Sequence, residues 1–199
     1  MQIVLASQSP YRKSQLQNFG LKFEAVSPLV DEEALKESGP KDLKELTRFL
    51  AYQKAISLRE KYPLAILIGG DQLVELDGLR LDKPGSFERA FRQLKAMQGK
   101  THRLITSLSV AGPEYVSTFT DITHVTLKKL NDAAIESYLN QDQPFDCAGS
   151  YKIEKAGMCL IEKVESSDPS AIQGLPLISL TAGLEAVGIE IKTMWKDPK

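Results

Sequence analysis

The chain has 199 residues, 42% hydrophobic and 26% charged, which is enough for one large or two small domains with a buried core. Its formal net charge of -1 at pH 7 gives no electrostatic support for binding long DNA or RNA. The two cysteines form neither a metal-binding spacing nor a disulfide framework, and neither a signal peptide nor a membrane-spanning run is recognisable. We therefore expect a soluble cytoplasmic protein that binds no membrane.

Hydrophobic periodicity in the first half of the chain alternates between strand and helix spacings. The predicted elements in chain order are a strand over 2–6, a helix starting near Ser9, a strand over 21–26, an acidic loop over 28–40, an amphipathic helix from Leu43 to about Lys61 and a strand over 64–68. The last strand is apolar at every position, so we expect both of its faces to be covered.

The second half contains the remaining predicted elements of an α/β protein. They are a helix over 85–97, two strands over 101–112 and 114–127 that form a hairpin, a helix over 131–140 capped by Asn131 or Asp132, a strand over 158–164 and a helix over 177–187. No internal repeat, low-complexity stretch or linker is recognisable. The organisation favours a single domain over 1–199, with two lobes around a cleft.

The segment "LASQSPYRKSQL" carries two cations where a helix dipole prefers acidic residues. Ser9 is a good N-cap residue, yet Arg12 and Lys13 follow in the first turn, which the dipole disfavours by roughly 0.3–1 kcal/mol per charge. Backbone N–H groups after Ser7 and Ser9 would form an anion site with these cations. The alternative is an ordinary capped helix with solvated cations.

Lys54 falls near the middle of the apolar stripe of its predicted helix. At 100° per residue, the same face carries Leu43, Leu46, Leu50 and Leu58. One interpretation is that its aliphatic stem runs along the helix and brings the ammonium to water. The other is a lysine that points into a polar cavity and holds anions.

The predicted strand over 64–68 is followed by "GGD", which places Asp71 near its carboxyl end. Ligands of α/β proteins gather at the carboxyl ends of such strands. Glycines permit close backbone approach, and a carboxylate there can bind a metal or accept a proton. The alternative is an ordinary turn aspartate after a strand.

Two further motifs complete a set of charges suited to a polyphosphate. Lys83 in "LDKPG" is held extended by the proline that follows it, and "VDEE" contributes Glu32. Each motif alone is typical of a solvated loop, but with the cations above they could neutralise phosphates, while Glu32 and Asp71 could hold Mg²⁺. Because no Walker A loop, G-x-S-x-G or G-x-G-x-x-G is present, phosphate chemistry needs another scaffold.

In their order and spacing these motifs resemble the Maf family of nucleotide pyrophosphatases nearly end to end. The segments that carry the resemblance are "LASQSPYRKSQL", "VDEE", "KAISL", "IGGDQLVEL", "DKP", "LKAMQGKTHRLITSLSV", "AGSYKIEKAG" and "IQGLPLISL". The resemblance implies an elongated mixed sheet flanked by helices, with two lobes around a cleft, similar to inosine-triphosphate pyrophosphatases. It also implies hydrolysis of a nucleoside triphosphate to the monophosphate and pyrophosphate, a divalent cation (Mg²⁺ or Mn²⁺) and a homodimer.

The resemblance also implies roles for individual residues of this chain. Asp71 stands where the family places its proton acceptor, and Glu32 joins it in holding the metal ion. The groups expected at the phosphates are the catalytic cations Arg12, Lys54 and Lys83 and the helix-start residues Ser7, Ser9 and Lys13.

Three positions depart from many family members, which have arginine at position 11, "GADT" in place of "GGDQ" and glutamine at position 154. Tyr11, Gln72 and Glu154 together resemble the subgroup that acts on 7-methyl-GTP. A carboxylate at Glu154 would favour a cationic base, and Tyr11 would offer it a ring face. The predicted role is house-cleaning of non-standard nucleotides. The alternatives are a dTTP/UTP pyrophosphatase of the same family and a non-catalytic nucleotide-binding regulator of cell division.

Overall fold

The computed structural model describes residues 2–190 and residue 192. In this part of the chain, seven strands form one mixed sheet with the order β2-β1-β3-β5-β6-β7, and β4 pairs with β3. β2, β1 and β3 are parallel, whereas β5, β6 and β7 continue the sheet antiparallel. The strands are β1 (Ile3–Ala6), β2 (Glu24–Val26), β3 (Ile66–Leu76), β4 (Leu79–Leu81), β5 (Thr101–Ala111), β6 (Val116–Leu127) and β7 (Ile161–Glu165).

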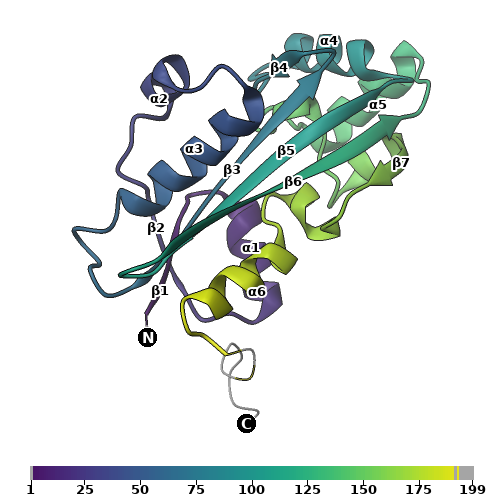
Figure 1. The fold of residues 1–199 in the computed structure, drawn as a ribbon. Coiled ribbons are helices and arrows are strands. Elements are labelled where there is room, and N and C mark those ends of the chain that lie inside the picture. The colour runs from purple at the N-terminus through teal and green to yellow at the C-terminus, as the bar shows by residue number, and fades with distance from the viewer. Residues whose placement is uncertain (1, 191, 193–199) are drawn as a thin grey trace.

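Helices cover both faces of this sheet (Figure 1). They are α1 (Pro10–Phe19), α2 (Glu32–Ser38), α3 (Leu43–Ile56), α4 (Phe87–Met97), α5 (Asp132–Asp142) and α6 (Leu177–Ala186), with the 3-10 turns η1 (Ala148–Ser150), η2 (Ala156–Leu160) and η3 (Pro169–Gln173). α3 lies on one face of β3, while α1 and α6 lie on the other face (Figure 1). The predicted α/β class, the hairpin and every predicted helix are confirmed, and Asn131 is the N-cap of α5.

The acidic segment forms α2, so the predicted loop over 28–40 is wrong. Asp31 caps the helix, because its Oδ1 accepts a hydrogen bond from the backbone N–H of Ala34 at 3.1 Å. Glu32 and Glu33 occupy the first turn, where the helix dipole stabilises negative charge. Acidic residues that indicate a solvated loop by composition therefore form a helix start.

β3 is longer than predicted and continues through "GGD" to Leu76, so Asp71 lies within the strand. β3 extends this far because β5 pairs with it from Leu67 to Glu75. Gly69 is required by close packing: a Cβ there would lie 2.2 Å from the carbonyl oxygen of Ala51 on α3. The predicted helix from Leu43 ends at Ile56 rather than near Lys61.

The other differences are short. β2 covers only Glu24–Val26 of the predicted 21–26. The start of the predicted strand over 158–164 is the 3-10 turn η2, and β7 begins at Ile161. None of the helices described is both long and apolar enough to cross a membrane.

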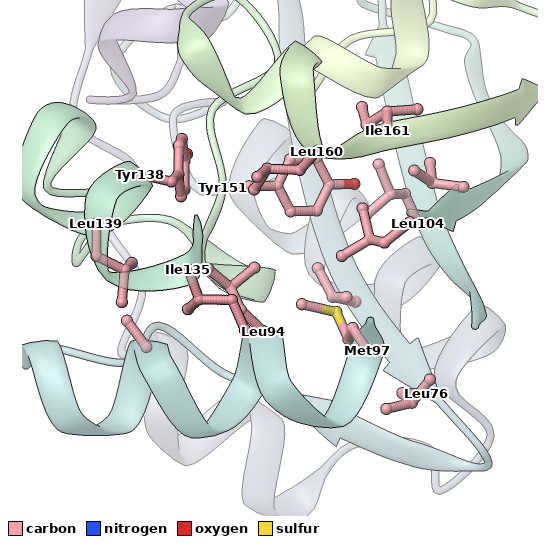
Figure 2. Packing of buried hydrophobic residues seen from close by; sticks show 14 residues of the cluster. Leu76, Leu94, Met97, Leu104, Ile135, Tyr138, Leu139, Tyr151, Leu160 and Ile161 are labelled. Atoms are coloured by element: carbon pink, nitrogen blue, oxygen red, sulfur yellow. The ribbon is translucent and has the colours of Figure 1, made fainter. Parts of the chain in front are cut away.

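Of the four hydrophobic clusters among the described residues, the two largest lie in different lobes of the predicted arrangement. One packs β1, α1 and α6 against β3 and β5, with Leu16 and Leu180 at its centre. The other lies at the far end of the sheet, where Figure 2 shows Leu94 and Met97 of α4 beside Ile135 of α5. β3, β5 and β6 run through both lobes (Figure 1). The single-domain assignment over 1–199 stays a prediction.

Candidate active site

A gap in the sheet lies between the two lobes, along one edge of β3. β1 pairs with Ile66–Gly69, and β4 pairs with Val74–Leu76 on the same edge. Among the described residues, no strand pairs with Gly70–Leu73 on that side. Side chains from the two faces of the sheet can meet at such a gap, and Asp71 lies in it.

Asp71 and Gln72 point to opposite faces of β3, as neighbours in a strand do. On the Asp71 side lies α3, since Lys54 Nζ is 2.6 Å from Asp71 Oδ1. On the Gln72 side lies η3, because the amide Nε2 donates to the carbonyl oxygen of Ala171 at 3.0 Å. The two residues are adjacent in sequence but act at different walls of the cleft.

Buried Lys54 and Asp71 and half-exposed Glu32 form a group of charges, called here the charge cluster. Lys54 Nζ lies 2.6 Å from both Glu32 Oε2 and Asp71 Oδ1. Because Lys54 is only 5% exposed, its ammonium does not reach along the helix to water; that it also holds the anions of a ligand stays a prediction. Burial alone would raise the pKa of Glu32, but its ion pairs with Lys54 and Lys36 lower it to about 2.

Arg12 connects α1 to this cluster across the gap. Its Nε donates to the carbonyl oxygen of Gly174 at 3.0 Å. Burial lowers the pKa of Arg12, while the negative charges of Asp71 and Glu32 raise it, so the guanidinium lies within their field. Gly70 makes room, since a Cβ there would lie 3.2 Å from Arg12 Nε. Arg12 therefore lies at the gap in the sheet, between α1 and the charge cluster.

Of the predicted residues at the helix start, Ser9 lies on the wall of the central cavity together with Arg12. Ser9 caps α1 by accepting from the N–H of Arg12 at 3.4 Å and lines the central cavity. Ser7 is buried, and its Oγ accepts from the N–H of Ser9 at 3.1 Å. Neither Ser7 nor Lys13 lines the cavity. Ser7 thus shapes the turn that presents Ser9, and the expected phosphate contacts of Ser7 and Lys13 stay predictions.

A cavity of about 240 Å³ lies beside the gap. The structure brings together on its wall six of the predicted site residues, namely Ser9, Tyr11, Arg12, Gln72, Lys83 and Glu154. Leu104, Tyr151 and Ile153 give it an apolar side. Lys83 and Glu154 are exposed at its rim. An apolar wall with a few convergent polar groups is the usual make-up of a small-molecule site.

Gln72 is less available to a ligand than predicted. Its amide nitrogen donates to Thr106 Oγ1 at 2.8 Å and to the carbonyl oxygen of Ala171 at 3.0 Å. Gln15 holds the other side of the same segment, donating to the carbonyl oxygens of Ser170 and Leu175 at 2.8 and 2.7 Å. Both glutamines therefore anchor η3, which forms part of the cavity wall. η3 is followed by Gly174, whose carbonyl oxygen accepts from Arg12.

Asp146 and Cys147 are cavity residues that the sequence did not single out. The Tyr11 hydroxyl donates to Asp146 Oδ2 at 3.2 Å and accepts from Cys147 Sγ at 3.4 Å. Lys152 pairs with Asp146 at 2.9 Å. The only sign of them in the sequence was their position just before "AGSYKIEKAG". Their contact with Tyr11 could not be expected from local pattern, because Tyr11 and Asp146 are 135 positions apart.

Glu32 and Asp71 fit a divalent cation by their chemistry. Asp71 Oδ2 is buried and has no hydrogen-bond partner among the described residues, and a buried unpaired oxygen costs about 1–3 kcal/mol. Carboxylate oxygens suit Mg²⁺, which commonly takes one or two of them together with substrate phosphates. Within the described part of the chain, no group of three or more potential ligands forms a complete protein site.

The fold and the site together define an α/β protein with a cleft, lined by Arg12 and Lys83, beside a buried carboxylate–lysine pair. The family model described as Maf-like protein matches residues 2–187, and the chain belongs to this family. A protein from Bdellovibrio bacteriovorus named 7-methyl-GTP pyrophosphatase is 48% identical, over 92% of this chain and 96% of its own length. One of the same name from Xanthomonas axonopodis pv. citri is 42% identical, over 95% and 98%.

A solved structure with partial similarity is a nucleoside-triphosphatase, described as a dITP/XTP pyrophosphatase, from Mycobacterium abscessus. It shares 14% sequence identity with a TM-score of 0.41, covering 65% of this chain and 76% of that one. At this overlap, the similarity adds nothing about the site.

Proposed function

We propose that the protein is a nucleoside triphosphate pyrophosphatase whose preferred substrate is 7-methyl-GTP. The observation that carries the proposal is the buried Asp71–Lys54 pair beside Arg12, with one oxygen of the carboxylate unpartnered among the described residues. The names of the curated relatives from Bdellovibrio and Xanthomonas support the reaction and the substrate. Their high coverage of both chains means that the whole catalytic unit is compared.

In this proposal the substrate lies along the cavity with its phosphates toward Arg12. Ser9 and Lys83 line the same wall and complete the phosphate contacts. The base packs on the apolar side beside Tyr151 and Ile153. Glu154 at the rim then accepts hydrogen bonds from the base, and charge-assisted bonds of this kind are worth roughly 1.5–3 kcal/mol.

The reaction follows from the placement of Asp71. A water molecule attacks the α-phosphorus and gives its proton to the free carboxylate oxygen of Asp71, while the bond from the α-phosphorus to the bridging oxygen breaks and pyrophosphate leaves. Lys54 holds the other oxygen of this carboxylate at 2.6 Å and keeps the carboxylate oriented. Arg12 neutralises negative charge that develops on the phosphate oxygens.

A divalent cation is the cofactor that we propose, as Mg²⁺ or Mn²⁺. Glu32 and Asp71 would hold it, and when bound it would neutralise phosphate charge and polarise a phosphoryl oxygen. Lys54 lies between these two carboxylates and sets their separation.

The test is product analysis with purified protein and four nucleotides: 7-methyl-GTP, GTP, dTTP and UTP. We expect each cleaved nucleotide to give its monophosphate and pyrophosphate, with the highest kcat/KM for 7-methyl-GTP and loss of turnover on chelation. Orthophosphate and a nucleoside diphosphate as products would contradict the proposed reaction. A preference for dTTP or UTP would overturn the substrate alone, and binding without any cleavage would favour a nucleotide-binding regulator.

We also propose a cytoplasmic location and a homodimer. The substrate is an intracellular type of metabolite, and the dimer is carried over from the family resemblance. Light scattering coupled to size-exclusion chromatography measures the mass directly, and a monomer at micromolar concentration would contradict the dimer.

A further inference from the structure

Neighbouring side chains in the first turn of α1 point to two different parts of the cleft. Arg12 is fixed at Gly174 and lies in the field of Asp71 and Glu32. The Tyr11 hydroxyl instead donates to Asp146 at 3.2 Å. These contacts define a phosphate end at Arg12 and a second end, which we call the base end, formed by Tyr11, Asp146 and Glu154.

The contact between Tyr11 and Asp146 joins the two lobes. α1 packs in the hydrophobic cluster of β1 and α6, whereas Asp146 follows α5, which packs in the cluster of α4. Lys152 holds Asp146 at 2.9 Å, and Cys147 Sγ donates to the Tyr11 oxygen at 3.4 Å. The phenol is thus restrained at its oxygen by two neighbours, so the ring is held as a wall of the cavity.

The base end carries two carboxylates, those of Asp146 and Glu154. The ammonium of Lys152 pairs with Asp146 at 2.9 Å. Burial lowers the pKa of Lys152, but its hydrogen bond to Asp146 and the charges of Asp146 and Glu154 raise it, so all three groups lie within electrostatic reach. A ligand with a cationic ring and anionic phosphates matches the opposite charges of the two ends.

We propose that Asp146 is a specificity-determining residue, which fixes the ring of Tyr11 against the base and adds negative charge that selects a positively charged base. The inference rests on the proposed function, because it assigns the base to this end of the cavity. Tyr11 then acts as a fixed cation–π surface for a methylated purine. Because the Asp146 side chain is 58% exposed, solvent screens its charge and the expected effect is moderate.

The test compares kcat/KM for 7-methyl-GTP and GTP in wild type, Asp146→Asn and Tyr11→Phe. Asp146→Asn keeps the shape and loses the charge, so the ratio of 7-methyl-GTP to GTP should fall about three- to tenfold. Tyr11→Phe keeps the ring and loses its anchor, so the same ratio should fall. Since Asp146 acts partly through Tyr11, the double variant should lose less than the product of the single effects. Glu136→Gln, at an exposed position on α5, is the matched control and should keep the wild-type ratio.

Calorimetric binding of 7-methyl-GMP and GMP to the same proteins gives a readout that does not depend on turnover. The tighter binding of the methylated product by wild type should weaken in Asp146→Asn, and Tyr11→Phe provides the same comparison if the aspartate variant does not fold. If wild type prefers the methylated nucleotide and Asp146→Asn shows the same ratio of methylated to unmethylated nucleotide, this inference alone is overturned. A wild type that cleaves no nucleoside triphosphate would overturn the proposed function, and equal binding of 7-methyl-GMP and GMP by wild type would overturn this inference.

Discussion

The charge cluster and the base end of the same cleft are built in different ways. In the charge cluster, Lys54 comes from the last turns of α3 and Asp71 from inside β3, and both are about 5% exposed. At the base end, Tyr11 comes from a helix start and Asp146 from the segment after α5, and the Asp146 carboxylate is 58% exposed. The buried pair is fixed by regular elements, whereas the base end depends on a long-range contact between lobes.

This difference separates the chemistry from the choice of substrate. Changing one member of a buried ion pair leaves an uncompensated charge, which costs about 3–5 kcal/mol. Changing an exposed carboxylate costs little stability, usually within about 0.5 kcal/mol. The base end can therefore vary among relatives without disturbing the residues that cleave the phosphoanhydride bond.

The largest expected effect comes from Asp71→Asn, which breaks the charge cluster. The amide keeps the shape but cannot accept the proton, so kcat should fall about 10²–10⁴-fold. Binding of nucleoside monophosphate should persist, because the base end is intact. Steady-state kinetics and calorimetry check both, and a folded variant with near wild-type turnover would rule out Asp71 as the base.

Lys54→Met tests whether the charge cluster is held by its lysine. The side chain keeps most of its apolar volume, but Asp71 loses its buried partner, so the free energy of unfolding should fall by about 3–5 kcal/mol at neutral pH. Urea denaturation measures this change. Adding Asp71→Asn removes the stranded charge and should restore part of the stability, and a double variant no more stable than Lys54→Met would contradict the pairing.

Lys83→Met tests a cation of the cleft that lies outside the charge cluster. Lys83 is exposed and lines the cavity, so stability should stay within about 0.5 kcal/mol of wild type. If it contacts phosphates, kcat/KM should fall about tenfold for every nucleotide, since a charged hydrogen bond contributes roughly 1.5–3 kcal/mol. Lys22→Met, at an exposed position before β2, serves as the control, and equal kinetics in the two variants would contradict the role of Lys83.

The smallest effect concerns pH and Glu32. Its pKa in the folded protein is about 2, below the ordinary value of 4.5, so the ionised group stabilises the fold above about pH 4.5. This contribution is lost as the pH falls toward 2. Thermal unfolding at pH 6 and pH 3 should show a smaller loss of Tm in Glu32→Gln than in wild type, and equal losses would show that the ion pairs of Glu32 do not contribute.

Local pattern predicted most elements of this fold and the inward lysine, but not the extent of β3. Hydrophobic periodicity reports on one segment at a time. Asp71 lies in the strand because β5, from a later part of the chain, pairs with it. For the same reason, nothing in the local sequence indicated that Gln72 and Asp71 face opposite sides of the sheet. Asp146 could not be found from local sequence, since its significance arises only when the lobes bring it to Tyr11.

The separation of the chemistry from the choice of substrate is tested most directly by measuring kcat/KM for 7-methyl-GTP, GTP, dTTP and UTP. The proteins compared are wild type, Asp71→Asn and Glu154→Gln. Asp71→Asn should lower all four values by a similar factor and keep their ratios. Glu154→Gln should narrow the advantage of 7-methyl-GTP over GTP and leave GTP turnover nearly unchanged. If Asp71→Asn instead changed the ratios, or Glu154→Gln lowered all four values equally, the division of the cleft into a chemical part and a selecting part would be contradicted.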